Sequence, residues 1–177
     1  VTVGDNGTIL TSTDVTSWTE RTSGTSKSLT GVTYGNGTFV TVGYTVSTST
    51  TSTSDNSTTT ITTEKSTTTL TSSDGVTWTL RDSGTSNELR GSITYGNGLF
   101  VTVGWEGTIL TSSDGNSWTQ RFYGGWNRLL GVTYGNGLFV TVGDEDYILT
   151  STDGTTWDNR TSGTTQHLSE VTYGNGL

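Results

Sequence analysis

One phrase recurs along the chain and constrains its fold more than any other feature. It is a Tyr-Gly-Asn-Gly turn followed by a short apolar run and Val-Gly, found as YGNGTFVTVG at residues 34–43 and as YGNGLFVTVG from Tyr95 and Tyr134. A fourth copy starts at Tyr173, and the Val-Thr-Val-Gly that would continue it stands at residues 1–4. Counted from Val-Thr-Val-Gly, repeats start at residues 1, 40, 101 and 140. The sequence therefore predicts four copies of one structural unit.

Each repeat has the pattern of short strands rather than helices. Apolar positions spaced by three and four residues, which an amphipathic helix requires, do not recur. The Gly-Asn-Gly segment tolerates the positive φ of a tight hairpin, and neighbouring apolar residues such as Phe39 and Val40 occupy both faces of one strand. Repeats of about 40 residues with four short strands are typical of β-propeller blades. We predict an all-β fold, a β-propeller of four repeats in a single domain over residues 1–177.

The repeats also predict how such a ring closes. Residues 170–173 have the pattern of a first strand and residues 1–4 that of a second strand. Pairing of these N- and C-terminal strands would complete one blade from both ends of the chain and remove two exposed sheet edges. An open segment of a larger ring, or a tandem array, is the competing architecture.

The second repeat is longer than the others because of an insertion at about residues 44–67. The insertion is rich in Thr, which has a high β propensity, it contains no Pro, and residues 54–57 (Ser-Asp-Asn-Ser) suit a turn. We predict a Thr-rich β-hairpin that extends outward as an arm and allows self-assembly with a neighbouring molecule. A disordered, O-glycosylated Ser/Thr-rich loop is the alternative. Asn56, in an Asn-Ser-Thr sequon at the tip, is the predicted glycosylation site.

A second motif, a Ser-x-Asp segment that ends in Trp, also occurs once per repeat. Its four copies are STDVTSW at residues 12–18, SSDGVTW at 72–78, SSDGNSW at 112–118 and STDGTTW at 151–157. The motif resembles the Asp-box, or bacterial neuraminidase repeat, family of β-propeller blades. It departs from that family in a spacing one residue shorter and in Val15, where the other copies have Gly. The Asp side chain suits the hydrogen bonds of a turn, and we expect all four Trp side chains to be buried between blades.

Composition excludes several kinds of partner. The net charge of −8 repels phosphate backbones and anionic lipid surfaces, and no apolar run is long enough to span a membrane. We therefore expect neither nucleic-acid binding nor membrane insertion. The chain has no Cys, so thiolate metal sites and thiol nucleophiles are absent. Abundant Thr, Ser and Gly, with only 14% charged residues, favour an extracellular or cell-surface location.

The resemblance raises the question of catalysis, because sialidases and other glycosidases are built on such propellers. A sialidase-like mechanism would need three converging arginines, yet four of the arginines recur once per repeat, just after the motif Trp, as structural residues do. No two acidic residues stand out as the carboxylate pair of a general glycosidase. His167 is expected to be an exposed loop residue, and residues 144–146 (Asp-Glu-Asp) a solvated turn. We predict no catalytic residues, no metal and no cofactor.

Positions where the repeats differ carry the specific information. Trp105 replaces Asp5 after Val-Gly, and RFYGGWNRLL at residues 121–130 replaces RTSGTSKSLT. The resemblance implies that these two loops share one face of a propeller, with Tyr44 and Tyr147 beside them. Exposed aromatic rings with polar donors stack on sugars or anchor protein interfaces, although they could instead fill a gap in a small ring or contact the arm. The predicted ligand-binding residues are Trp105, Phe122, Tyr123, Trp126 and Arg128.

These observations predict a non-catalytic, secreted or surface-displayed module with a structural or adhesive role, as a subunit of a surface layer or fibre. Its partner would be a glycan or a protein. A lectin-like carbohydrate-binding module is the alternative, and a sialidase-like glycosidase is less favoured. An assembly factor, similar to the propellers that help to build photosystem II and resemble this pattern, is a more distant possibility.

Overall fold

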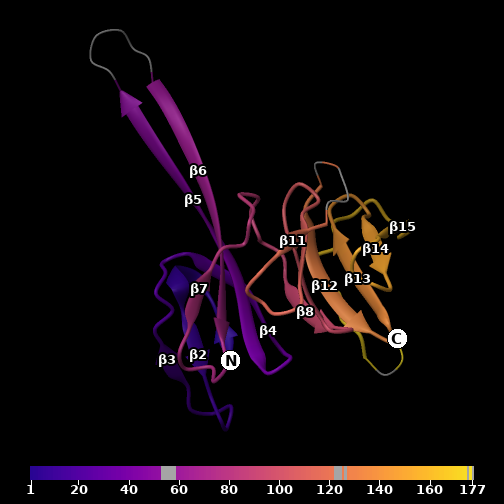
Figure 1. Ribbon diagram of the computed structural model, residues 1–177. Coiled ribbons are helices and arrows are strands. Elements are labelled where there is room, and N and C mark those ends of the chain that lie inside the picture. The colour runs from indigo at the N-terminus through magenta and orange to yellow at the C-terminus, as the bar shows by residue number, and fades with distance from the viewer. Residues whose placement is uncertain (53–58, 122–124, 126, 175, 177) are drawn as a thin grey trace.

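The computed structural model describes residues 1–52, 59–121, 125, 127–174 and 176, and these residues form antiparallel sheets that follow one another in chain order (Figure 1). The first sheet contains β1 (Thr2–Val3), β2 (Ile9–Thr11) and β3 (Thr19–Arg21), with the short 3-10 turn η1 (Asp5–Gly7) after β1. The second contains β4 (Ser28–Gly35), β5 (Thr38–Ser52), β6 (Thr59–Ser72) and β7 (Thr79–Arg81). The third contains β8 (Ile93–Gly96), β9 (Leu99–Val103), β10 (Ile109–Ser112) and β11 (Thr119–Gln120). The fourth contains β12 (Leu129–Gly135), β13 (Leu138–Gly143), β14 (Ile148–Ser151) and β15 (Asp158–Arg160).

Strands within each sheet pair in sequence order, which is the topology of propeller blades. We call the sheets the first to fourth blades. The Tyr-Gly-Asn-Gly segment forms the predicted hairpin turn, because Asn36 and Gly37 both have positive φ angles, of 47° and 74°. The predicted all-β propeller fold, with one blade per repeat, is confirmed.

The core lies between blades rather than within one central layer. In the second and third blades, Val40 and Phe100 are fully buried, and in the fourth Phe139 is fully buried. Inner strands β4, β8 and β12 lie side by side, and the hydroxyl of Ser92, just before β8, accepts a hydrogen bond from the backbone N–H of Val132 at 2.8 Å. A blade therefore needs apolar residues on both faces, as the sequence pattern indicates.

The Ser-x-Asp segments form one repeated turn. In the second blade, Asp74 Oδ1 accepts hydrogen bonds from the backbone N–H groups of Val76 and Thr77, both at 2.8 Å, and from the Ser72 hydroxyl at 2.9 Å. The arginine after each turn is structural, as expected: Arg81 Nε donates to Thr71 Oγ1 at 3.1 Å, and the other three blades repeat this bond.

One expectation for these turns is wrong. The Trp157 side chain is 9% exposed, whereas Trp18 is 45% exposed. Trp18 belongs to the first blade, which lies at one end of the row of sheets that the structure describes (Figure 1). Val15 in the same turn adopts a φ of 56°, the left-handed conformation that glycine takes in the other three copies.

The lowered pKa values of the turn carboxylates predict that the folded chain loses stability in acid. Hydrogen bonds from the backbone N–H groups of Thr77 and Val76 lower the pKa of Asp74 to about 2, and hydrogen bonds within the turns also lower the pKa values of Asp14, Asp114 and Asp153. A lowered folded-state pKa gives stability that is present above the unfolded value of about 4 and is lost as pH falls through the folded value.

We expect the melting temperature to drop between about pH 4 and pH 2. Asp74→Asn should lower the melting temperature at pH 7 and reduce the further drop in acid. Glu20→Gln, which changes an exposed carboxylate outside the turns, should leave both unchanged. A melting temperature that is flat from about pH 4 to pH 2 would contradict this role of the turns.

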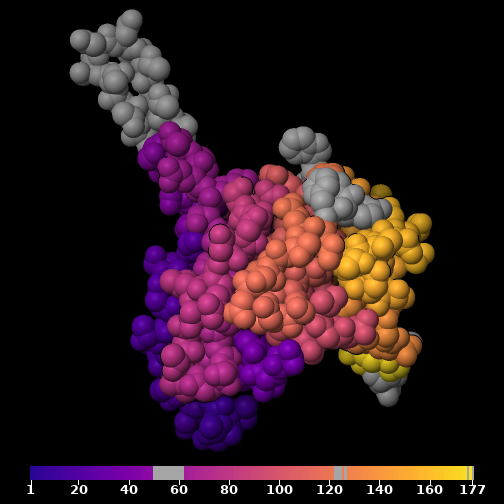
Figure 2. Space-filling model, in the orientation of Figure 1, coloured from indigo at the N-terminus to yellow at the C-terminus, as the bar shows by residue number. Residues whose placement is uncertain are grey.

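The insertion forms the predicted β-hairpin arm. Pairing of β5 with β6 runs from Phe39↔Ser72 to Ser52↔Thr59, whereas β4 accompanies β5 only as far as Tyr44. The described part of the arm therefore leaves the body as a two-stranded ribbon (Figures 1 and 2). The predicted turn at residues 54–57 and the predicted glycosylation site Asn56 lie outside the described residues.

Closure by residues 1–4 and 170–173 stays a prediction. Within the described residues, β1 pairs with β2 alone, and residues 168–174 are not assigned to a strand. The latter segment lies against β12, where Gly135 faces the ring of Tyr173. The first and fourth blades lie at opposite ends of the row of sheets (Figure 1).

Candidate functional site

One edge of the sheets brings together the positions at which the repeats differ. These positions follow the second strand of a blade or precede its first strand. Trp105 donates its backbone N–H to the Glu88 carbonyl at 2.9 Å, and Asp144 donates in the same way to the Arg128 carbonyl at 3.0 Å. Tyr44 occupies the equivalent position of the second blade, opposite Ser28. Side chains from three blades therefore meet beside the base of the arm.

Arg90 lies at the centre of this group. Its guanidinium carbon is 4.3 Å from the ring centroid of Tyr44 and 4.6 Å from that of Trp105, so it bridges two aromatic rings from neighbouring blades. Arg90 Nε also donates a hydrogen bond to Glu88 Oε2 at 2.5 Å. The stack and the hydrogen bond together fix the orientation of a planar donor group.

Glu88 is a buried carboxylate that two cations neutralise. Its side chain is 2% exposed, and Lys65 Nζ lies 3.3 Å from Oε1 while Arg90 bonds Oε2. Burying a carboxylate without such partners would be strongly unfavourable. Lys65 also lies 3.8 Å from Glu106 and 5.5 Å from the centroid of Trp105. Because Lys65 stands on β6, this network ties the base of the arm to the third blade.

A second ion pair flanks the first. Arg128 Nε and Nη2 donate to the two carboxylate oxygens of Asp144, at 2.5 and 3.2 Å. Burial raises the pKa of Asp144, but the hydrogen bond and charge of Arg128 outweigh burial and hold this pKa below its ordinary value. The same hydrogen bond raises the pKa of Arg128. His167 Nδ1 lies 2.9 Å from Asp144 Oδ1.

These contacts correct one expectation and refine another. Asp144 is buried and paired, so residues 144–146 are not simply a solvated turn. His167 is exposed, as predicted, but it also contacts Asp144. We call the whole group the Arg90 cluster; its members are Tyr44, Lys65, Glu88, Arg90, Trp105, Glu106, Arg128 and Asp144.

Two of the predicted ligand-binding residues belong to the Arg90 cluster. The Arg128 guanidinium carbon is 5.5 Å from the ring centroid of Trp105, so the structure brings these residues together. Phe122, Tyr123 and Trp126 lie outside the described residues. Tyr147, which the resemblance places on the same face, packs against the core of the fourth blade.

Sequence reasoning missed Lys65, Glu88 and Arg90 as site residues. Arg90 could have been found by the rule that selected Trp105, because the second and fourth blades have Thr30 and Leu130 at the same position. The contact between Lys65 and Glu88 could not have been found in this way, since it crosses from the arm of one blade to the segment before the inner strand of the next.

The Arg90 cluster balances cations against carboxylates around one indole ring. Three cations surround the ring of Trp105, and three carboxylates balance their charge. In the part of the chain that the structure describes, no group of three or more His, Asp or Glu side chains is placed to hold a metal ion. No helix among the described residues is long and apolar enough to cross a membrane.

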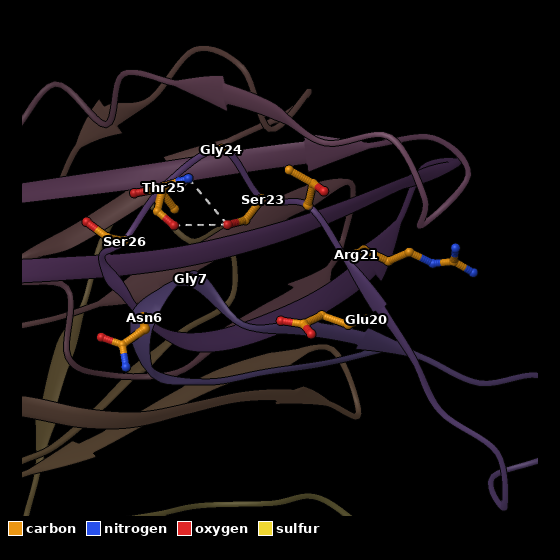
Figure 3. Close-up of a pocket in the computed structure, with 9 residues that line it drawn as sticks. Asn6, Gly7, Glu20, Arg21, Ser23, Gly24, Thr25 and Ser26 are labelled. Carbon is orange, nitrogen blue, oxygen red and sulfur yellow. Dashed lines mark hydrogen bonds between the residues drawn. The ribbon is translucent and has the colours of Figure 1, made fainter.

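A separate hollow of about 660 Å³ lies on the first blade (Figure 3). Its lining is mostly small and polar, and the hydroxyl of Ser23 donates to the Thr25 carbonyl at 3.1 Å and accepts from the Thr25 N–H at 3.3 Å. The Arg21 side chain points away from these groups in Figure 3 and bonds Thr11 instead. The polar groups that line the hollow thus form hydrogen bonds within the chain itself.

The fold and the Arg90 cluster together define a β-propeller domain that carries a group of cationic and aromatic side chains at one edge of its blades. The family model described as DUF6242 beta propeller domain matches residues 60–170. The chain belongs to this family. Among curated proteins, no sequence matches the chain.

Solved structures share the fold at low sequence identity. A structure of YCF48 bound to D1 peptide is 18% identical, with a TM-score of 0.60 over 95% of this chain and 51% of that one. YCF48 from Cyanidioschyzon merolae is 16% identical, with a TM-score of 0.59 over 97% and 54%. The computationally designed Ika4 protein is 10% identical, with a TM-score of 0.57 over 84% and 81%. The chain spans about half the length of the YCF48 chains.

Proposed function

We propose that the chain is a non-catalytic binding module that recognises a segment of a protein partner at the Arg90 cluster. The observation that carries this proposal is the Arg90 guanidinium, held between Tyr44 and Trp105 and oriented by the buried Glu88. A planar donor fixed in this way is suited to carbonyl and carboxylate oxygens, and aromatic and Arg side chains are the usual anchors of protein interfaces.

Two further observations support a protein segment as the ligand. The free edge of β5 begins at the cluster, because β4 stops pairing at Tyr44, and an extended segment could add to that edge. In addition, one of the similar propellers, YCF48, binds a D1 peptide. That structure is only 18% identical, so it supports the kind of ligand and not its sequence.

A glycan is the second candidate, as the sequence suggests. Sugar rings stack on open aromatic planes. The ring of Trp105 lies under the guanidinium of Arg90, so a sugar would have to displace a stacked and hydrogen-bonded cation. This geometry favours the protein segment.

The proposal also covers the wider role of the chain. The composition favours an extracellular or surface location, and the arm suits self-assembly with a neighbouring molecule in a surface layer or fibre, by addition to its sheet.

The four Ser-x-Asp turns are assigned to the Asp-box type. Support for that assignment comes from the carboxylate bonds of the turns and from the indole N–H of Trp157, which donates to the Gly154 carbonyl at 3.2 Å.

A displayed library of random peptides, selected against residues 1–177, tests the proposal. Selected peptides should bind Arg90→Lys at least tenfold more weakly, because lysine keeps the charge beside Glu88 but loses the planar donor fork. Arg160→Lys, on the outer strand β15, is the matched control and should bind with unchanged affinity. Equal binding of peptides to the unaltered chain and Arg90→Lys would overturn the proposal, as would a glycan array that gives ligands where the peptide library gives none.

A further inference from the structure

The insertion gives the second blade a strand edge that the other blades lack. In the third and fourth blades the second strands, β9 and β13, end at Val103 and Gly143, beside their first strands. β5 instead continues to Ser52, whereas its pairing with β4 ends at Tyr44. Among the described strands, β5 beyond Tyr44 therefore pairs with β6 on one side only (Figure 1).

Backbone groups of alternate residues face the side of β5 that lies opposite β6. In the third blade the residue equivalent to Tyr44 is Trp105, which donates its N–H to the Glu88 carbonyl, on the side of the first strand. Tyr44 pairs with β4 on the same side. Because N–H and C=O groups point to one side of a strand at every second residue, those of Val46 and Thr48 face this side as well. We call this side of β5, at Val46 and Thr48, the open edge.

The chain before β4 turns away from the open edge. Gly7 donates its N–H to the Lys27 carbonyl at 2.8 Å, so the segment that precedes Ser28 runs toward the first blade. The side chain of Val46 is 38% exposed, and that of Thr48 is also exposed. An extended segment thus has access to both residues.

The two edges of the arm are protected to different degrees. Native proteins usually keep an edge strand from pairing with charged side chains or Pro, and β5 has neither at residues 45–52. On β6, by contrast, Glu64 and Lys65 are charged. The carbonyl of Thr67, also on β6, already accepts a hydrogen bond from Lys27 Nζ at 2.8 Å. The unprotected edge of the arm is therefore that of β5.

The open edge is continuous with the Arg90 cluster. Tyr44, Val46 and Thr48 share one face of β5, because side chains alternate along a strand. Arg90 stacks on the ring of Tyr44, with its guanidinium carbon 4.3 Å from the ring centroid. Lys65, which stands opposite Val46 on β6, forms its ion pair with the third blade. A segment that pairs with β5 at Val46 therefore lies beside Tyr44 and within reach of Arg90.

We propose that the protein segment recognised at the Arg90 cluster binds as an extended strand on the open edge, through the backbone groups of Val46 and Thr48. This inference rests on the proposed function and adds the conformation of the ligand and the backbone contacts that hold it. The exposed Val46 side chain favours an apolar residue opposite it. The net charge of −8 disfavours an acidic segment. The ligand class is thus an extended, non-acidic segment with an apolar residue at the position that faces Val46.

Backbone N-methylation of a bound peptide tests the proposal on the unaltered chain. A peptide from the displayed library that Arg90→Lys binds more weakly is resynthesised with one N-methyl group at each position in turn. We expect affinity to fall about tenfold at two positions separated by one residue, because each loses a donor to the open edge. The residue between these two positions should tolerate the N-methyl group, since its N–H points away from β5.

The outcomes separate this inference from the proposed function. A peptide that still needs Arg90 but tolerates N-methylation at every position would overturn strand addition and leave the proposed function standing. Peptides that bind the unaltered chain and Arg90→Lys equally would overturn the proposed function, and strand addition with it.

A matched pair of proline variants tests the open edge from the side of the chain. Thr48 and Thr63 stand directly opposite each other in the arm, and both are exposed. By the same alternation, the N–H of Thr63 faces the other edge, so neither N–H belongs to the hydrogen bonds between β5 and β6. Thr48→Pro should weaken peptide binding about tenfold, whereas Thr63→Pro should leave it unchanged. Equal affinities of the two variants would contradict the proposal.

A second copy of the chain is the other candidate for the open edge, since its own β5 has the same unprotected backbone. Pairing of two β5 strands would occupy Val46 and Thr48 without a ligand at the Arg90 cluster. Light scattering of the unaltered chain and of Thr48→Pro separates the two occupants. We expect the same mass in solution for both. A larger assembly of the unaltered chain that Thr48→Pro dissociates would assign the edge to a second copy and overturn the proposal.

Discussion

Phe139→Ala is expected to lower the free energy of unfolding by about 3–5 kcal/mol, the usual cost of removing a fully buried phenylalanine. Phe139 has no exposed surface, and its ring centroid lies 4.6 Å from that of Tyr134 and 6.3 Å from that of Trp157. Truncation would leave a cavity at the centre of the fourth blade. Denaturant unfolding, followed by tryptophan fluorescence, measures the change.

The chain supplies a matched control for this prediction. Phe39 stands at the same position of the second blade and makes the equivalent contacts with Tyr34 and Trp78, but it is only half-buried. Phe39→Ala should therefore cost clearly less. Equal losses for the two variants would show that burial between blades does not set the stability of the fold.

Arg90→Leu is expected to lower the free energy of unfolding by about 3 kcal/mol, because it leaves the buried Glu88 carboxylate with Lys65 as its remaining partner. Adding Glu88→Gln should recover part of the loss, since the uncompensated charge is then removed. The two substitutions should therefore be strongly non-additive.

Arg160→Leu is the control for this ion pair. Arg160 pairs with Asp158, but both side chains are more than half exposed, and such surface pairs contribute about 1 kcal/mol or less. A loss for Arg90→Leu no greater than that for Arg160→Leu would contradict the assignment of Glu88 as a buried, charge-compensated carboxylate.

Much of the fold could be predicted because each repeat is encoded locally. The Gly-Asn-Gly turns fix the hairpins, the apolar runs on either side of them are too short for helices, and the long Thr-rich insertion contains no Pro to stop a strand. The predicted burial of Trp18 is wrong, because burial between blades depends on a neighbour that the turn sequence does not specify.

The candidate site was harder to predict than the fold. The difference between repeats at Trp105 and Arg128 pointed to the edge of the blades at which the Arg90 cluster lies, and the structure brings these two residues together. The Arg90 stack depends on side-chain contacts between blades, and so does the burial of Glu88 by Lys65 from the arm. Contacts between side chains of different blades leave no pattern in one sequence.

The central claim is that the Arg90 cluster binds a protein segment, and a chemical-shift map tests it most directly. The isotope-labelled chain would be titrated with a peptide selected from the displayed library, and side-chain N–H signals followed by NMR. The account predicts the largest shifts at the indole N–H of Trp105 and the Nε–H of Arg90, which lie together at one edge of the blades. Shifts confined to the Ser-x-Asp turns and the indole of Trp18 would place binding elsewhere and contradict the claim.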